Sequence, residues 1–208
     1  MKEFVIQYKK INQKLFDYLT SIVLSSWMIA ILILWSFLEA SIWPIFPEFI
    51  LVFFIILSPK NYRKLFLISF VSSILGVASF FLFAHLFPAA ADNLLMKVPL
   101  VNKNMLLHID ILYQNGGTIL VVKQPFSAIP IKVWTFMAAK NSIGFLPFML
   151  LVSLIRGIRF FILAFFGSII GAKLKKSIRG NFLLFIVTYI AIFLLLWTVL
   201  SFTYTLYL

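Results

Sequence analysis

The sequence predicts an all-α protein that crosses a membrane several times. Hydrophobic residues fill 63% of the 208 positions and charged residues only 12%, which gives a mean hydropathy of +1.08. The apolar runs occupy most of the chain and leave no segment long enough for a separate globular unit. We therefore expect a single membrane domain over residues 19–208, preceded by a short amphipathic helix over residues 1–18.

The net charge of +12 is carried by short clusters that flank the apolar runs. Lysines and arginines gather within residues 1–18, 59–64 and 173–180. Such clusters are typical of the cytoplasmic ends of membrane helices, which places the N-terminus in the cytoplasm. No basic stretch is interleaved with aromatic residues as in a nucleic-acid groove, so we expect no nucleic-acid partner.

The N-terminal segment has the pattern of a helix that lies on the membrane surface. Apolar side chains recur there at spacings of three and four, with lysines on the other faces: Phe4, Tyr8, Ile11, Leu15 and Tyr18. This periodicity favours an amphipathic helix at the interface. A frayed and solvated N-terminus is the open alternative.

Two prolines interrupt the first long apolar segment. Residues 19–42 are apolar up to Glu39, Pro44 and Pro47 follow, and residues 49–58 are apolar again. A continuous helix must break here, because proline lacks an N–H and clashes with the preceding turn. The stretch from Trp43 to Ser58 would extend roughly 24 Å as a helix, which is short for a membrane core of about 30 Å. A re-entrant hairpin from the cytoplasm fits the basic flanks, and two full spans joined by a proline turn remain the alternative.

A clear span follows at residues 65–87. Small residues recur along it at helical spacing, which suits close helix packing in lipid: Ser69, Ser72, Gly76 and Ser79. Residues 88–117 form the longest polar stretch. Their lysines are balanced by Asp92 and Asp110, so we expect an external loop.

The pattern of the first hairpin returns at residues 118–141. Pro125 and Pro130 break the apolar run, and Lys132 follows closely. Neither half is long enough to span alone, so we expect a second re-entrant hairpin that enters from outside. Two interrupted segments of opposite topology are typical of inverted repeats in transporters, whose substrate site lies between the repeats.

Two helices complete the expected fold, at residues 145–172 and 182–206. The first ends at a basic cluster and carries Gly157, Gly167 and Gly171, which suit close contact with a hairpin. The second contains no charged residue, and we expect it to face lipid.

Five charged side chains lie inside these apolar segments: Glu39, Glu48, Lys132, Arg156 and Arg159. An ionisable group in hydrocarbon costs roughly 2.5 to 3.5 kcal/mol or more, so each should face a partner or a water-filled cavity. Arg156 and Arg159 share one helix face, and converging hairpin tips would bring Glu48 towards Lys132. Three positive and two negative charges leave one positive charge, which is a vacancy for an anion.

An anionic lipid headgroup suits this vacancy, because a guanidinium binds phosphate through two hydrogen bonds. The sequence therefore predicts a substrate site made of the five charges. A structural role, in which they form two ion pairs and one snorkelling base, is the alternative. Glu39 and Glu48 are also candidate proton carriers.

No other group of residues indicates an enzyme, a cofactor or a metal centre. The chain has no cysteine, His85 stands alone near a span end, and His108 with Asp110 lacks a third ligand. Zinc-protease, nucleophile-elbow and phosphate-loop motifs are absent. We therefore expect a protein that is not an enzyme and holds no cofactor.

Several of these segments resemble the DedA-like membrane proteins, also called the VTT or SNARE-associated Golgi protein family. The resemblance covers roughly residues 39–172 and rests on Pro47-Glu48, Ala128-Ile129-Pro130-Ile131-Lys132-Val133, Ala138-Ala139 and Arg156-Gly157-Ile158-Arg159-Phe160-Phe161. The most similar branch reads Pro-Ile-Pro-x-Lys in its second hairpin. Ser127 and Val133 stand where better-studied branches carry arginine.

The resemblance implies two facing re-entrant hairpins and the movement of phospholipids or undecaprenyl phosphate between leaflets, in some cases coupled to protons. Glu39 and Glu48 match the family's acidic positions, and Lys132 and Arg156 match its basic positions. We therefore expect a lipid transporter or scramblase of the bacterial inner membrane, with anionic headgroups as partners. A scaffold or envelope-homeostasis protein that recruits partners through basic cytoplasmic loops is the rival, and homo-oligomerisation stays open.

Overall fold

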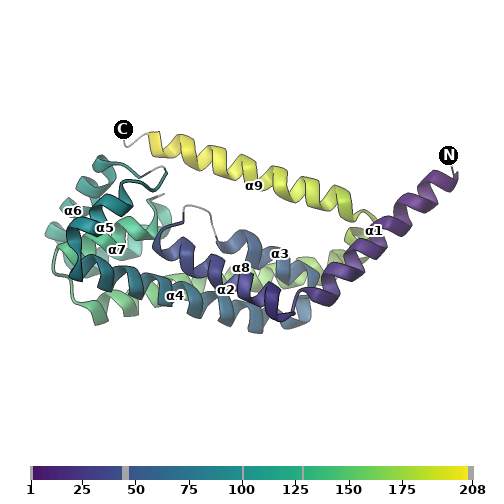
Figure 1. Cartoon of the computed structure of the whole chain (residues 1–208), viewed down its shortest axis with the longest axis horizontal. Coiled ribbons are helices and arrows are strands. Elements are labelled where there is room, and N and C mark those ends of the chain that lie inside the picture. Colours follow the sequence, from purple (N-terminus) through teal and green to yellow (C-terminus); the bar gives the residue numbers. More distant parts are fainter. Residues whose placement is uncertain (1, 44–46, 100, 128, 206–208) are drawn as a thin grey trace.

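The computed structural model describes residues 2–43, 47–99, 101–127 and 129–205, and in these ranges the chain forms helices and no strand. The elements are α1 (Lys2–Ile22), α2 (Ser26–Ser41), α3 (Pro47–Leu57), η1 (Pro59–Asn61), α4 (Tyr62–Leu86), α5 (Pro88–Leu95), α6 (Lys103–Gly116), η2 (Gly117–Phe126), α7 (Ile131–Lys140), α8 (Phe145–Gly180) and α9 (Phe182–Thr205). The longest helices run along the long axis, α5 to α7 gather at one end, and α1 projects from the other (Figure 1).

Four helical segments in the described ranges are long and apolar enough to cross a membrane: Pro59–Leu86, Lys103–Phe126, Phe145–Gly180 and Phe182–Val199. Ile6–Ile22 and Ser26–Ser41 would add a fifth span if they count as one, although they are bent by 76°. Several apolar helices of this length indicate a multi-pass membrane protein. The spans expected at residues 65–87, 145–172 and 182–206 are helices α4, α8 and α9.

α1 docks onto the turn between α8 and α9. Asn12 is buried and its Oδ1 accepts a hydrogen bond from the Leu183 backbone N at 2.7 Å. Asp17 pairs with Arg179, and the Phe16 ring packs edge-on against Phe182. Among the residues expected to form the membrane-facing side, Ile11 and Tyr18 remain exposed. The helix continues to Ile22, beyond the predicted end at residue 18.

α2 and α4 pack closely because small polar side chains separate them. The Ser36 and Ser69 hydroxyls are buried and lie 2.7 Å apart, which links the two helices. A Cβ on Gly76 would overlap the backbone oxygen of Phe37 and lie 3.0 Å from the Cβ of Ala40. Ser69 and Gly76 of the predicted small-residue stripe therefore face α2, whereas Ser72 is buried and bonds its own helix and Ser79 is exposed.

α3 lies against α8 through a second close approach. A Cβ on Gly171 would lie 2.8 Å from the Ile56 Cα, whereas a Cβ on Gly167 would meet α3 side chains no closer than 3.5 Å. Gly157 faces Phe70 on α4, again with room for a Cβ. Of the predicted packing glycines, Gly76 and Gly171 are thus the two that close backbone contact requires.

α9 covers α3 with aromatic side chains and exposes most of its other residues. Phe49 stacks on Tyr189 and contacts Phe193, and the Tyr189 hydroxyl donates to the Phe49 carbonyl at 2.6 Å. Only 6% of its apolar window is buried within the described chain. This exposure agrees with the expectation that the last helix faces lipid.

The prediction of a loop at residues 88–117 is wrong, because most of this stretch is helical. Asn102 caps the N-terminus of α6, because its Oδ1 accepts a hydrogen bond from the Met105 N–H at 2.9 Å. Met105, Ile109 and Tyr113 are buried at a spacing of four, so the polar residues that suggested a loop lie on the other faces of an amphipathic helix. The Tyr113 hydroxyl donates to the Trp134 carbonyl on α7 at 3.2 Å.

The chain changes direction near the prolines that the sequence singled out. Pro47 begins α3, Pro125 lies inside η2, and Pro130 precedes α7. Pro44 lies outside the described residues. New helices therefore begin at Pro47 and directly after Pro130, as the missing N–H of proline predicts, whereas Pro125 does not end η2.

Buried apolar residues form two clusters with a polar layer between them. Along α8, Val152 belongs to one cluster and Phe160 to the other, with Arg156 between them. Along α4, Val77 belongs to the same cluster as Val152 and Leu65 to the same cluster as Phe160. Three buried serines lie between them: Ser69, Ser72 and Ser73. The polar layer thus crosses the bundle near the middle of α4 and α8.

Candidate functional site

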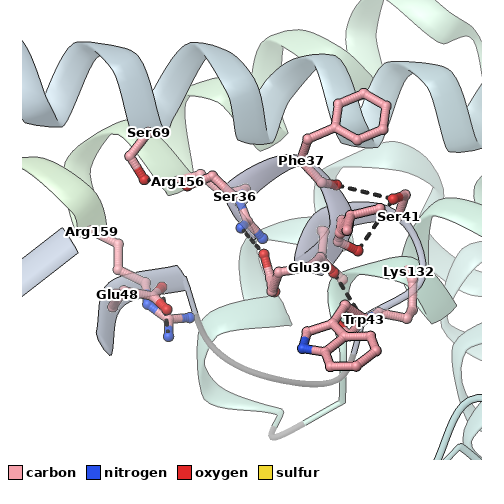
Figure 2. Close-up of polar contacts among 12 residues, drawn as sticks. Ser36, Phe37, Glu39, Ser41, Trp43, Glu48, Ser69, Lys132, Arg156 and Arg159 are labelled. Atoms are coloured by element: carbon pink, nitrogen blue, oxygen red, sulfur yellow. Dashed lines mark hydrogen bonds and ion pairs between the residues drawn. The ribbon is translucent and has the colours of Figure 1, made fainter. Parts of the chain in front are cut away.

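An ion pair between Glu39 and Arg156 lies at the centre of the polar layer. α2 supplies Glu39 and α8 supplies Arg156, and Nη2 lies 2.6 Å from Oε2 with both side chains largely buried. The guanidinium also lies over the Phe160 ring, 5.3 Å from its centroid. Among described residues the buried Nε of Arg156 has no hydrogen-bond partner. This pair joins two helices that are far apart in sequence (Figure 2).

Lys132 occupies the same layer but binds backbone instead of a carboxylate. Its side chain is 1% exposed, and Nζ donates to the Glu39 carbonyl at 2.9 Å and to the Trp43 carbonyl. These oxygens lie at the C-terminal end of α2, where helix carbonyls lack partners and the helix dipole favours a cation. Lys132 therefore fixes the end of α2 to the start of α7 (Figure 2).

The second ion pair joins Glu48 and Arg159. Glu48 lies in the first turn of α3, where the helix dipole favours an acid, and its Oε1 is 3.0 Å from the Arg159 Nη2. The Arg159 side chain is 38% exposed, against 11% for Glu48. The buried Oε2 of Glu48 has no hydrogen-bond partner among the described residues. Arg159 is thus the most accessible charge of the layer, and its acid is only half satisfied.

A cavity of about 280 Å³ opens beside this pair, between α3, α8 and α9. Glu48 and Arg159 are the charged residues of its wall, and apolar side chains form most of the rest, including Val52, Leu163 and Leu196. The Tyr189 ring closes one side. A polar headgroup with an apolar tail matches this combination of one ion pair and long apolar walls.

The structure brings all five predicted residues into one region but pairs them differently from the prediction. Glu48 was expected to approach Lys132, whereas it pairs with Arg159 and Lys132 binds the end of α2. The reason is the register of α8, whose two arginines, three residues apart, reach acids on different helices. The predicted surplus positive charge is Lys132, which is buried and bonded to carbonyls.

Sequence reasoning missed two parts of the site. The buried serines of α2 and α4 were assigned to packing alone, although they continue the polar layer. Tyr189 belongs to a helix without charged residues, yet its side chain lines the cavity and its hydroxyl donates to the Phe49 carbonyl. Regular spacing of small residues was a signal for the serines, but no sequence signal singled out Tyr189.

The histidines do not join the site. His85 and His108 are exposed, and Asp110 accepts from Asn141 Nδ2 at 2.8 Å and from Gln114. Within the described ranges no group of three or more histidines and acids is placed to hold a metal ion.

No known protein family, curated protein or solved structure matches the chain.

Proposed function

We propose that this protein moves lipids with anionic headgroups, phospholipids or polyprenyl phosphates, from one leaflet to the other. The observation that carries the proposal is the accessible Arg159–Glu48 pair on the wall of an otherwise apolar cavity. A charge in such surroundings is costly unless a partner compensates it, and charges inside membrane proteins commonly mark substrate pathways. The DedA-like resemblance of residues 39–172 supports the same function.

A phosphate would bind by replacing Glu48 as the partner of Arg159. The guanidinium offers several N–H donors, and phosphate accepts two of them in parallel. The acyl or prenyl chain would lie along Leu163 and Leu196, which keeps it out of water while the headgroup crosses. Arg156 is a poor first contact by comparison, since it is buried against Glu39.

Proton coupling is part of the proposal. When the headgroup takes Arg159, the Glu48 carboxylate loses its ion-pair partner and faces apolar walls. Uptake of a proton removes this uncompensated charge, and release restores the pair once the headgroup leaves. A transmembrane pH gradient should therefore drive transport. Transport that is indifferent to the gradient would leave Arg159 as a binding site without proton coupling.

We further propose that the segments around Pro47 and Pro130 form two re-entrant hairpins, which enter from the cytoplasmic and the outer face of a bacterial inner membrane. A helix too short to cross a membrane alone follows each break, namely α3 after the first and α7 after the second, and supports this arrangement. Lys132 bonds the first broken segment to the second. This arrangement would give the two segments the inverted relation that the DedA-like resemblance implies and that transporters with inverted repeats share.

The test is lipid movement by the purified protein in liposomes with fluorescent phospholipid or polyprenyl phosphate. Arg159→Gln should reduce the rate at least tenfold, because a charge-assisted contact to phosphate contributes about 1.5 to 3 kcal/mol. Arg179→Gln is the matched control, since Arg179 also pairs with an acid but lies away from the cavity. Because Arg159→Gln leaves the largely buried Glu48 carboxylate without its ion pair, the melting temperature of each variant is measured first, and the rates are compared between folded proteins.

The rival function is a scaffold whose buried charges only hold the fold. The ion pairs of Glu39 with Arg156 and of Glu48 with Arg159 favour this rival. A scaffold predicts that Arg159→Gln and Arg179→Gln behave alike and that wild-type protein moves lipid no faster than empty liposomes. Arg156→Gln does not separate the two functions, because a buried carboxylate without its partner costs about 3 to 5 kcal/mol and endangers folding.

A further inference from the structure

A second cavity, of about 490 Å³, lies at the basic end of the bundle. α1, the turn at η1 and α8 form its wall, and none of the charges of the polar layer lines it. α3 separates the two sites, with Glu48 in its first turn and Leu57 at its last residue, roughly 14 Å further along the helix. The second cavity therefore needs an explanation separate from the lipid pathway.

Two lysines from different elements line this cavity. Lys60 belongs to η1 and Lys175 to α8, and both are exposed. No residue of the described ranges gives either ammonium a hydrogen bond or an ion pair, and the cavity wall contains no acid. The acid on this part of α1, Asp17, pairs with Arg179. The positive charge at the cavity is therefore uncompensated.

A buried hydroxyl supplies an independent sign of a ligand. Thr20 lines the cavity, and its Oγ1 is buried with no hydrogen-bond partner among the described residues. A helical threonine usually bonds a carbonyl of the preceding turn, and a buried donor without a partner costs about 1 to 3 kcal/mol. The hydroxyl is thus placed to bond whatever enters the cavity.

We propose that this cavity binds a phosphate monoester through Lys60, Lys175 and the Thr20 hydroxyl. A monoester carries a charge of roughly −1.5 to −2 at neutral pH, which matches two ammonium groups better than a phosphodiester or a carboxylate does. Leu57 and Ile169 provide apolar contact for the carbon atoms that carry the phosphate. Lipids and soluble metabolites both offer this chemistry.

Binding at this position joins three elements, of which α1 and α8 are also linked by the Asp17–Arg179 ion pair. Lys60, Lys175 and Thr20 come from η1, α8 and α1, so the ligand would hold the bend between α1 and α2 against the rest of the bundle. A ligand that binds only the folded state raises stability. Occupancy should therefore raise the melting temperature as well as register in a binding assay.

The experiment uses the full chain in nanodiscs of phosphatidylcholine. One arm adds phosphatidic acid as a lipid monoester, a second adds phosphatidylglycerol as a diester at the same mole fraction, and a third adds glycerol phosphate as a soluble monoester. Saturable binding of phosphatidic acid alone identifies a lipid ligand. Saturable binding of glycerol phosphate identifies a soluble one, and both results support the site.

Neighbouring lysines provide a matched control. Lys60→Gln with Lys175→Gln should weaken binding at least tenfold, since hydrogen bonds to charged groups contribute about 1.5 to 3 kcal/mol each. Lys64→Gln with Lys176→Gln removes the same charge from exposed residues that do not line the cavity, and should change binding less than about threefold. Thr20→Val should weaken binding by about three- to tenfold.

Three results would overturn the proposal. Equal losses in the two lysine pairs would show diffuse attraction by the basic surface. Phosphatidylglycerol binding as tight as phosphatidic acid binding would remove the monoester preference, and no saturable binding in any arm would remove the site. Every arm is repeated with Arg159→Gln, which removes headgroup binding at the transport cavity, so that the effect of the lysine pairs belongs to this site and stays distinguishable from failure of the proposed lipid transport.

Discussion

Lys132 is a buried ammonium whose partners are backbone carbonyls. Glu39 contributes its carbonyl to Lys132 and its carboxylate to Arg156, so a single residue joins α2 to both α7 and α8. The two interactions of Glu39 have different structural roles. The ion pair neutralises charge inside the bundle, whereas the lysine satisfies helix-end carbonyls that lipid would leave unpaired. The polar layer therefore contains structural charges beside the one accessible arginine.

Lys132→Met should destabilise the protein by roughly 2 kcal/mol, because the methionine fills the space but leaves the Glu39 and Trp43 carbonyls without their donor. Unfolding in mixed detergent micelles measures the change. Lys140→Met is the control on the same helix, since Lys140 is exposed, and it should stay within about 0.5 kcal/mol of wild type. Equal stability of the two variants would contradict the helix-end role of Lys132.

Close helix contacts determine where the charged side chains meet. α4 approaches α2 at Gly76 and α8 approaches α3 at Gly171, and both contacts involve backbone atoms of the neighbouring helix. Small residues at such positions let helices associate in lipid, where the hydrophobic effect does not drive them together. The approach of α3 to α8 is what brings Glu48 within reach of Arg159.

Gly171→Ala should cost about 1 to 3 kcal/mol, because its Cβ would lie 2.8 Å from the Ile56 Cα and backbone cannot yield as a side chain does. Gly167→Ala lies one turn away on the same face, and its Cβ meets Ile55 and Val52 side chains at ordinary distances. The second substitution should be neutral or slightly stabilising, since alanine favours helix. Thermal unfolding of both variants in detergent tests the difference, and similar melting temperatures would contradict the close contact.

The helices were predictable where local composition decides them, and the contacts were not. Apolar length alone located α4, α8 and α9, and proline chemistry located the breaks at Pro47 and Pro130. Sequence analysis missed helix α6 because the stretch is rich in polar residues, although Met105, Ile109 and Tyr113 recur with the period of a helix. The partner of Glu48 depends on helix register across the bundle, which no single segment encodes.

The whole molecule is polarised along its long axis. α4 has 25 residues and extends roughly 38 Å, enough to cross a hydrocarbon core of about 30 Å, and η1 with Lys60 lies at one end while α5 lies at the other. α8 has 36 residues, so its basic last turns extend beyond such a core. The predicted end of this helix at residue 172 was too early, because lysines outside the core continue the helix to Gly180.

This polarity predicts the orientation in the membrane, with the basic end in the cytoplasm. The sequence contains no cysteine, so a single introduced cysteine is labelled by a thiol reagent without background from native thiols. In intact cells an impermeant thiol reagent should label Asn93→Cys on α5 and label Lys176→Cys on α8 only after the membrane is permeabilised, since both positions are exposed at opposite ends. Ile190→Cys, within the apolar α9, should resist the reagent in both conditions because lipid surrounds it.

Labelling of Asn93→Cys and Lys176→Cys from the same side would contradict the orientation. It would also mean that the polar layer does not lie between two aqueous compartments, which lipid transport through the Arg159 cavity requires.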